Sequence, residues 1–324
     1  MPDKLLSLVI PVYNVERYLP KCLDSVFIDN NFPEFNQLIE VIAVNDGSTD
    51  NSPCILEDYA KKYPLIVINQ LNDGLSMARN AGTKAASGKY VEFIDSDDYL
   101  LPGKLQKLTA YLQKNPSCDL LLFNYAIFVD GSKHFSKTKQ TGFDFKNMDG
   151  QTAMTVLFKK EINCVAAWLK IVNRNLILEH NLFFKKLHAE DVEWNPRVFG
   201  LVKNVGWLNE LVYAYRIRQG SLAHSEEAHK KFVAACPDIL ESWTEFLADN
   251  DFSQEYKITL YHIMTQLFWP LWEYSRANKE LLPTVEKYSW LMPYCAWNRK
   301  YIYRPLIQLI GIKNFYLLRH GHKI

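Results

Sequence analysis

Cysteine is scarce in this chain and is never paired at short spacing. The six cysteines among the 324 residues are Cys22, Cys54, Cys118, Cys164, Cys236 and Cys295. Their scattered spacing fits neither a zinc site nor the disulfide framework of a small secreted domain. We therefore expect a protein of a reducing compartment.

Excess charge and long apolar runs are absent as well. The formal net charge is +1, which gives no reason to expect a nucleic-acid partner. The longest stretch without a charged residue, 258–272, is too short and too polar to span a bilayer. The apolar run 5–12 is short and lacks a small-residue cleavage site, so no secretory signal is recognised. We expect a cytoplasmic protein.

Strand-like and helix-like segments alternate through the first hundred residues. Apolar runs predict buried strands at 5–10, 38–44, 65–69 and 90–94. Helical patterns lie between them, at 15–27, 53–63 and 75–86. Strands that alternate with helices over short connections predict an α/β fold with a mostly parallel, doubly wound sheet.

The remainder of the chain is less regular. The pattern predicts a helix, a strand, a mobile loop and a mainly helical stretch at 102–115, 119–129, 130–150 and 151–181. Residues 212–218 alternate like a strand, and beyond about residue 228 the composition becomes helical and aromatic.

Three carboxylates follow the fourth predicted strand within four positions. They are Asp95, Asp97 and Asp98, in what we call the acidic loop, residues 95–98. Like charges this close repel, and a hard divalent cation with oxygen ligands would relieve the repulsion. Asp and Ser also form solvated turns. From these residues alone, a metal site and an acidic turn both stay open.

Polar residues end all four predicted strands and should meet in one crevice. They are Tyr13 and Asn14, Asp46, the segment 72–79, and the acidic loop. The carboxyl ends of parallel strands share one edge of a sheet, where such folds bind ligands. This set suits a nucleotide diphosphate. Neither a glycine-rich loop ending in Lys-Ser/Thr nor Gly-x-Gly-x-x-Gly is present, so we expect a metal to handle the phosphates.

Four motifs carry a resemblance to a known family. They read Val9-Ile10-Pro11-Val12-Tyr13-Asn14, Val44-Asn45-Asp46-Gly47-Ser48-Thr49-Asp50, Asn72-Asp73-Gly74-Leu75-Ser76-Met77-Ala78-Arg79-Asn80 and Ile94-Asp95-Ser96-Asp97-Asp98. In this order and spacing the chain resembles the family 2 glycosyltransferases with the GT-A fold, of the bacterial surface-polysaccharide type. The likeness is strong over 5–125 and weaker over 160–222. Asp73 stands where many relatives have glycine.

The resemblance implies three parts of the chain. Residues 1–125 would form the nucleotide-sugar-binding half of a GT-A domain, and residues 126–227 the acceptor-binding, catalytic half. Residues 228–324 would form a helical, aromatic-rich extension.

The resemblance also implies a donor site. Its expected members are Pro11, Val12, Tyr13, Asp46, Arg79, Asp95, Ser96 and Arg216. The first three would line the base pocket, Asp46 would accept a hydrogen bond from the base, and Arg79 would lie near the nucleotide. Asp95 would touch the ribose or donor sugar. The alternatives are a packed core aromatic for Tyr13 and a helix cap for Asp46.

A metal site and a cationic strand complete the donor side in this resemblance. Asp97 would ligate Mn²⁺ or Mg²⁺, which bridges the diphosphate oxygens, and Asp98 would support that site. Arg216 and Arg218 could stabilise the departing diphosphate, although one of them could equally be a solvated edge charge. Trp168-Leu169-Lys170 and Tyr213-Ala214-Tyr215-Arg216, with Gly220-Ser221, also resemble family positions near donor and acceptor.

Members of the family carry a Glu-Asp pair at a helix start beneath the acceptor, and here Glu190-Asp191 looks like that pair. Asp191 would be the catalytic base, removing the proton from the acceptor hydroxyl, and Glu190 its orienting neighbour. The alternative is a plain helix N-terminus, where acidic residues are favoured. His188 and His224 are candidates for a sugar contact or a further metal ligand, but we assign neither.

The C-terminal residues 287–324 contain no Asp or Glu but many Lys, Arg and aromatic residues. Such a mixture suits an anionic membrane surface, for example the inner face of the cell membrane. Helices packed on the catalytic domain are an equal alternative. A homodimer interface is a third, because Phe268, Trp269, Pro270 and Trp272 would form a large apolar patch if exposed.

The resemblance thus predicts an inverting, metal-dependent glycosyltransferase. It would move a hexosyl residue from a nucleotide-diphosphate sugar, a UDP-sugar by preference, to a hydroxyl of a glycan or lipid-linked glycan. One alternative is an inactive module that binds nucleotide or glycan. A sugar nucleotidyltransferase is another, but the glycine-rich N-terminal loop of that class is missing.

Overall fold

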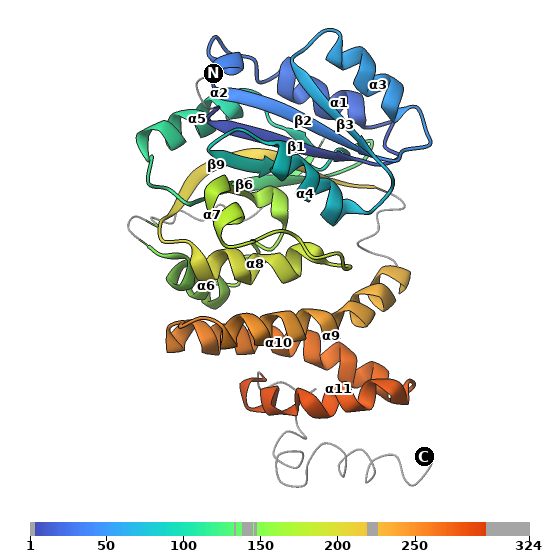
Figure 1. The fold of residues 1–324 in the computed structure, drawn as a ribbon, viewed down its shortest axis with the longest axis vertical. Helices are drawn as coiled ribbons and strands as arrows, with labels where there is room; N and C mark the ends of the chain where they lie inside the picture. The colour runs from blue at the N-terminus through green and yellow to red at the C-terminus, as the bar shows by residue number, and fades with distance from the viewer. Residues whose placement is uncertain (1–3, 133, 138–144, 146–147, 219–225, 296–324) are drawn as a thin grey trace. The chain divides into compact units, whose positions relative to one another are not determined.

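The chain folds into two compact units, 1–221 and 222–324, which we call the sheet unit and the helical unit. The computed structural model in Figure 1 describes residues 4–132, 134–137, 145, 148–218 and 226–295.

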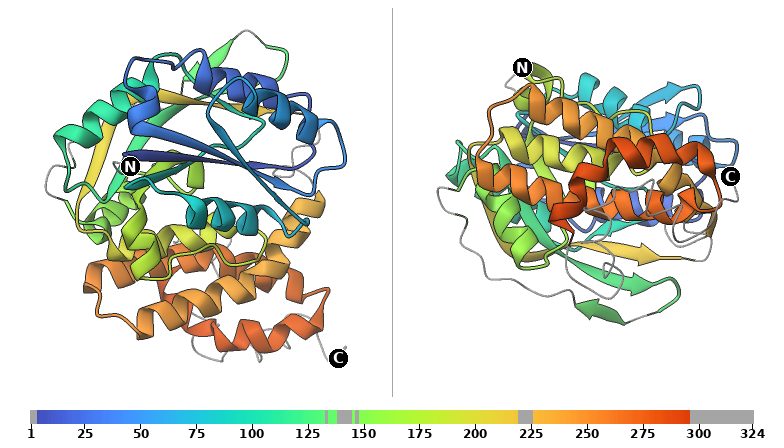
Figure 2. Two further views of the ribbon diagram at one scale, coloured as in Figure 1. Left: turned by 45° about the horizontal axis from the view of Figure 1, so that its top comes forward. Right: turned by 90° about the horizontal axis from the view of Figure 1, so that it is seen from below.

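One mixed sheet forms the centre of the sheet unit (Figures 1 and 2). Its described strands are β1 (Leu6–Val12), β2 (Ile39–Asp46), β3 (Leu65–Gln70), β4 (Tyr90–Phe93), β5 (Tyr99–Leu100), β6 (Leu120–Val129), β7 (Phe135–Lys137), β8 (Lys170–Asn173) and β9 (Val205–Ile217). They run in the order β3-β2-β1-β4-β8-β6-β9-β5, and β7 pairs with β6. The first four in this order are parallel, whereas β8 is antiparallel to both β4 and β6.

Helices cover both faces of the sheet. They are α1 (Leu19–Phe27), α2 (Phe35–Leu38), α3 (Ser52–Ala60), α4 (Leu75–Ala85), α5 (Lys104–Lys114), α6 (Gly150–Lys159), η1 (Ala167–Leu169), α7 (Arg174–Glu179) and α8 (Glu190–Leu201). Helices α1, α3 and α5 share a core with one face, and α4 packs on β1 and β2 from the other. Gly82 permits this approach, because a Cβ there would lie 2.3 Å from Val9.

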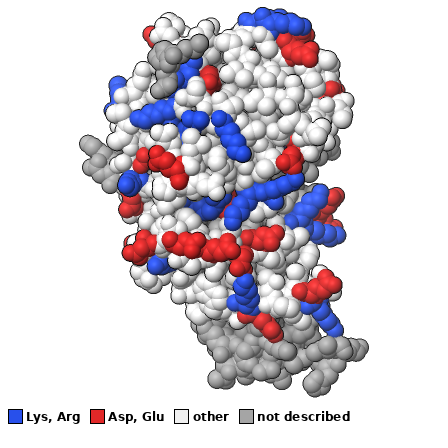
Figure 3. Space-filling model, in the orientation of Figure 1, with Lys and Arg blue, Asp and Glu red and all other residues white. Residues whose placement is uncertain are grey.

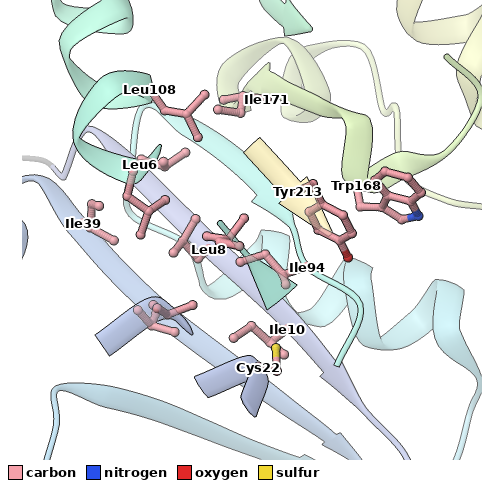
Figure 4. Packing of buried hydrophobic residues seen from close by; sticks show 14 of the residues in the cluster. Leu6, Leu8, Ile10, Cys22, Ile39, Ile94, Leu108, Trp168, Ile171 and Tyr213 are labelled. Atoms are coloured by element: carbon pink, nitrogen blue, oxygen red, sulfur yellow. The ribbon is translucent and has the colours of Figure 1, made fainter. Parts of the chain in front are cut away.

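Strand β1 is buried over its whole length, as its continuous apolar sequence predicts. Leu6, Leu8 and Ile10 alternate toward the layer of α1 and α5, and Figure 4 shows Ile10 beside Cys22 of α1. Each fully buried aliphatic side chain of this kind contributes about 1.5–3 kcal/mol. This core fixes the sheet edge at which β1, β2 and β4 end.

Glu92 interrupts this apolar core from the centre of β4. Its side chain is fully buried, and neither carboxyl oxygen has a hydrogen-bond partner among the described residues. Burial without a partner penalises the charged form and raises the pKa of Glu92 from 4.5 to about 8. The folded protein therefore holds a proton here that the unfolded chain releases at neutral pH.

This proton makes stability depend on pH. Below the unfolded pKa both states hold the proton, and between about 4.5 and about 8 only the folded state does, so the free energy of unfolding falls as pH rises. From about pH 5.5 to about pH 7.5, Glu92 lowers the free energy of unfolding by about 2–3 kcal/mol. We expect Glu92→Gln, which is neutral throughout, to lose this slope in urea unfolding measured against the wild type. Parallel pH profiles of the two proteins would show that the carboxyl is ionised in the fold.

The predicted α/β class and the helical C-terminal region are confirmed. Five of the six predicted strands and the helices between them agree to within a few residues, whereas β9 begins at Val205, seven residues before the predicted start at 212. The stretch 151–181 contains β8 as well as helices, and the predicted loop 130–150 contains β7. Both strands are too short for a period-2 hydrophobic pattern to be recognised in the sequence. Each is stabilised by pairing with a longer strand, β6.

The helical unit consists, within 226–295, of α9 (Glu226–Ala248), α10 (Gln254–Ser275), η3 (Lys279–Leu281), α11 (Leu282–Lys287) and η4 (Ser289–Tyr294). Trp243, Tyr256 and Phe268 are fully buried. Phe268 and Trp272 are buried and Trp269 and Pro270 are half-buried, so these four residues do not form the exposed apolar patch on which the dimer alternative depended.

Most of the basic and aromatic C-terminal segment, 296–324, lies outside the described residues. At its described start, Lys287 pairs with Glu241. On the face drawn in Figure 3, side chains of both charge signs occur. None of the helices in the described residues is both long and apolar enough to cross a membrane.

Candidate active site

Tyr13 leaves the sheet at the end of β1 with 49% of its surface exposed. Pro11 and Val12 before it are buried in the strand. Asn14 after it has a positive φ of 51°, and its Oδ1 accepts a hydrogen bond of 2.8 Å from the backbone N–H of Thr49. The loops after β1 and β2 are thereby tied together. Tyr13 is not a packed core aromatic, and its ring is available for stacking.

Asp46 ends β2 and fastens the loop that follows β3. Its Oδ1 accepts from Gln70 Nε2 at 2.6 Å and from the N–H of Asp73 at 2.9 Å, and its Oδ2 accepts from the N–H of Gly74 at 2.9 Å. Gly74 has a φ of 92°, which favours glycine. Asp46 is 3% exposed and caps no helix. It shapes the loop from which α4 begins.

Arg79 on α4 joins the acidic loop to the start of α8. Its Nη2 donates to Asp95 Oδ1 at 2.7 Å, and its Nη1 donates to Glu190 Oε1 at 2.6 Å. The guanidinium also lies 5.3 Å from the ring centre of Phe184, and the side chain is 3% exposed. We call this arrangement the Arg79 bridge. It places Arg79 beneath the loop, between two carboxylates that lie 95 residues apart (95 and 190) in the sequence.

Both carboxyl groups of the bridge have pKa values raised above their ordinary range. Burial raises the pKa of Asp95 and that of Glu190, and Arg79 opposes the rise in each case. Neighbouring carboxylates act in the same direction as burial, Asp97 on Asp95 and Asp191 on Glu190. Negative charge is therefore concentrated around Arg79, which pairs with both carboxylates.

Asp98 turns inward and anchors β9 to the acidic loop. Its residue is 1% exposed, its Oδ2 accepts from the Tyr213 hydroxyl at 3.0 Å, and its Oδ1 accepts from the N–H of Arg216 at 2.7 Å. The same Tyr213 hydroxyl accepts from the N–H of Asp95 at 3.0 Å. Both Asp98 oxygens are thus engaged with protein groups, which suits a support of the site rather than a direct metal ligand.

Asp97 turns the other way, with 27% of its side chain exposed and Oδ2 held by Arg218 Nε at 2.8 Å. Arg216 donates from Nε to the carbonyl of Asp97 at 2.7 Å and from Nη1 to Asp130 Oδ1 at 2.8 Å. Arg216 and Arg218 both lie over the ring of Tyr18. Two cations therefore flank Asp97, and neither is a free edge charge.

Glu190 and Asp191 form the first turn of α8, directly after Ala189, which has a positive φ of 60°. Asp191 accepts the N–H of Val192 at its Oδ1. Trp194 of the same helix donates from Nε1 to the carbonyl of Leu182 at 2.7 Å, which holds the helix start in place. Glu190 and Asp191 thus lie at a helix N-terminus, as the alternative prediction states, and this position is compatible with a catalytic role.

Lys170 lies fully buried behind this turn. Its Nζ donates to the carbonyls of Val165 and Ala166, each at 2.8 Å. Burial lowers the pKa of Lys170 to about 8, and the charge of Asp191 opposes that fall. Sequence reasoning named Lys170 only as part of the motif Trp168-Leu169-Lys170. A lone charged residue at the start of an apolar run, Lys-Ile-Val, was the available signal.

A metal ion bound here would need a bound substrate to supply part of its coordination shell. Among the described residues, no group of three or more His, Cys, Asp and Glu side chains is arranged to hold one. Mg²⁺ is commonly held by one or two carboxylates together with substrate phosphates, and Asp97 fits that mode. The residues present therefore fit an ion shared with a diphosphate.

The structure gathers most of the predicted site at one sheet edge. Asp95, Ser96, Asp97 and Asp98 share one loop with Arg216 against it, and the Arg79 bridge connects that loop to Glu190. His224 lies outside the described residues. The sequence did not single out Asp130, or Asn80, whose side chain exchanges two hydrogen bonds with the backbone of Phe184.

Comparison with known proteins gives one family. The model of the family described as Glycosyl transferase family 2 matches residues 7–179. GlyA of Streptococcus pneumoniae, a glycosyltransferase, is 32% identical over 82% of this chain and 38% of its own length. EpsH of Bacillus subtilis is 32% identical over 79% of this chain and 73% of its own length. The chain thus spans well under half of GlyA and about three quarters of EpsH.

The fold has solved counterparts. TarS of S. aureus, residues 1–349 in complex with UDP, superposes with a TM-score of 0.68 at 20% identity, covering 98% of this chain and 92% of that one. The same protein has been solved with UDP-GlcNAc. The likeness extends over the helical unit as well as the sheet unit, and it confirms the predicted GT-A architecture.

Proposed function

The chain belongs to glycosyl transferase family 2, and on that basis we propose that it transfers a sugar from a UDP-sugar to a carbohydrate hydroxyl with inversion of the anomeric centre. The observation that carries the proposal is the Arg79 bridge, which holds the acidic loop and the Glu190-Asp191 turn against one another. A donor group and a base must be neighbours for direct displacement.

On the donor side, Tyr13 would stack on the base and Asp46 would shape the base pocket through its loop. Asp95 and Ser96 would face the ribose or the sugar. UDP is favoured because TarS, with the same fold, was solved with UDP and UDP-GlcNAc. The acceptor would be a glycan or a lipid-linked glycan of the cell surface, as in this family.

In the transfer step, Asp191 removes the proton from the acceptor hydroxyl as its oxygen forms a bond to the anomeric carbon. The bond from that carbon to the diphosphate oxygen breaks, and the nucleoside diphosphate leaves with the electron pair. Arg216 and Arg218 would face the charge that develops on it, Arg218 exchanging Asp97 for the diphosphate. Asp97 would hold Mn²⁺ or Mg²⁺, which when bound neutralises diphosphate charge.

Thermal unfolding with nucleotides tests the donor and metal assignments together. A ligand that binds only the folded state raises the melting temperature, by an amount that corresponds to about 2.7 kcal/mol at a hundredfold excess over Kd. We expect a rise with UDP plus Mn²⁺ that exceeds the rise with UDP alone. Asp97→Asn should lose the part that depends on Mn²⁺, whereas Asp58→Asn, at an exposed ion pair, should keep it.

Two results would count against these assignments. An Asp97→Asn protein with the full Mn²⁺-dependent rise would remove Asp97 from the metal site. A wild-type protein that responds to no nucleoside diphosphate would leave the fold without a donor, and a glycan-binding module would then be favoured. A response to GDP in place of UDP would keep the mechanism and change the donor.

A further inference from the structure

A hollow lies beside the middle of β6, and no residue of the acidic loop lines it. It has a volume of about 260 Å³, and its lining includes Asn124, Tyr125, Glu161, Asn163, Cys164 and Trp207. We call it the β6 pocket. We propose that it binds one sugar ring of the acceptor, and so this inference rests on the proposed function.

Sheet register places the β6 pocket level with the acidic loop. Glu92 of β4 and Leu121 of β6 both pair with Ile171 of β8, so β4 and β6 run in the same direction at the same height. Asp95 and Asn124 each stand three residues further along. Because neighbouring strands lie about 4.8 Å apart, two strand spacings separate these positions by about 10 Å.

Two sets of contacts connect the β6 pocket to the catalytic groups. Cys164 lies in the pocket wall, and the carbonyls of the next two residues, Val165 and Ala166, accept hydrogen bonds from Lys170 Nζ. The ammonium of Lys170 also interacts electrostatically with Cys164 and Asp191. Tyr125, also in the wall, packs edge to face on Trp168 at 4.9 Å.

Trp168 in turn stacks on Tyr213 at 4.4 Å, the residue that bonds Asp98. The pocket is therefore a neighbour of both the candidate base and the acidic loop. In this proposal, a ring held there belongs to a glycan whose next unit presents its hydroxyl to Asp191.

The lining matches one face of a carbohydrate. Tyr125 and Trp207 line the pocket with apolar ring surface for the C–H face of a sugar, and the Trp207 ring is held by stacking on Phe145 at 5.5 Å. Asn124, Asn163 and Glu161 offer donors and acceptors for hydroxyl groups. Asn124 donates one amide N–H from Nδ2 to Asn209 Oδ1 at 3.0 Å, and this bond orients the Asn124 amide. Small-molecule pockets measure about 300–1,000 Å³, so this one is below the size for a nucleotide sugar. A single ring is the occupant that its size and chemistry fit.

The test compares two double variants with the same chemistry. Glu161→Gln with Asn163→Asp changes the polar groups of the β6 pocket, keeps the net charge, and keeps the side-chain oxygen that binds the N–H of Val165. Glu179→Gln with Asn181→Asp makes the same exchange at the end of α7. The first pair follows α6 and the second lies at the end of α7, and each includes a residue of positive φ, Glu161 in one and Asn181 in the other.

Binding of the methyl glycosides of glucose, galactose and N-acetylglucosamine to the full chain is measured by saturation-transfer NMR without donor. We expect at least one glycoside to bind the wild type and the α7 double variant equally. The Glu161→Gln/Asn163→Asp variant should bind it at least about tenfold more weakly, the loss expected for one hydrogen bond to a charged group.

Equal binding to all three proteins would place the sugar elsewhere and overturn the proposal. Binding of none of the three glycosides to the wild type would overturn it as well. Since the donor is absent, either result leaves the nucleotide assignment untouched. That assignment fails on its own if UDP produces no thermal response.

Discussion

Asp191→Asn is expected to slow sugar transfer by about 10²–10⁴-fold, the usual contribution of a positioned general base. Asparagine has the same shape and keeps the oxygen that accepts the N–H of Val192, so the first turn of α8 should fold as before. It cannot take up a proton at neutral pH. The loss should therefore fall on the transfer step and leave donor binding intact.

Steady-state transfer to a glycan acceptor, with UDP-sugar as donor, measures the effect as kcat at saturating substrate. The thermal response to UDP and Mn²⁺ in the same preparation shows that the donor site is preserved. Glu179→Gln, at an exposed position on α7, is the control for removing a carboxylate. If the Asp191→Asn protein bound donor normally and transferred at the wild-type rate, the base would have to be another group.

Arg79→Met is expected to lower the free energy of unfolding by about 3–5 kcal/mol, the cost of removing one partner from a buried ion pair. Asp95 and Glu190 would then be left without their shared cation at one buried position. Arg79→Lys should recover only part of the loss, because a single ammonium cannot reproduce the forked contact with two separate carboxylates.

Urea unfolding gives the comparison, with Arg17→Met as the matched control. Arg17 also pairs with a carboxylate, Asp130, but its side chain is 74% exposed, and such pairs contribute about 1 kcal/mol or less. Adding Glu190→Gln to Arg79→Met should restore part of the stability, because one of the two uncompensated charges is removed. Equal, small effects of Arg79→Met and Arg17→Met would mean that the bridge is not formed in solution.

Much of the arrangement at this sheet edge could be predicted from the sequence. Continuous apolar runs predict buried parallel strands. The polar residues that end these strands, from Tyr13 to Asp98, must then lie along one edge of the sheet. The position of Glu190-Asp191 at a helix start was also correct. These are local patterns, and the geometry of a parallel sheet carries them to the same place.

The destinations of individual side chains could not be predicted in this way. Asp97 and Asp98 are adjacent and chemically identical, yet one faces outward and the other anchors β9. Arg79, expected near the nucleotide, bonds to Glu190, 111 positions further along the chain. Such choices depend on which distant strand or helix arrives beside the loop, and a motif does not contain that information.

The place of β8 also decides when during synthesis this site can form. β4 has β8 as its neighbour on the side away from β1, and β8 is made some eighty residues later. Contacts of such long range slow folding, because the loop between them must close first. While the chain emerges from the ribosome, residues 1–125 have an open edge at β4 and an Arg79 without Glu190. Residues 1–125 therefore complete the sheet beside β4 and the Arg79 bridge only together with residues that are made later.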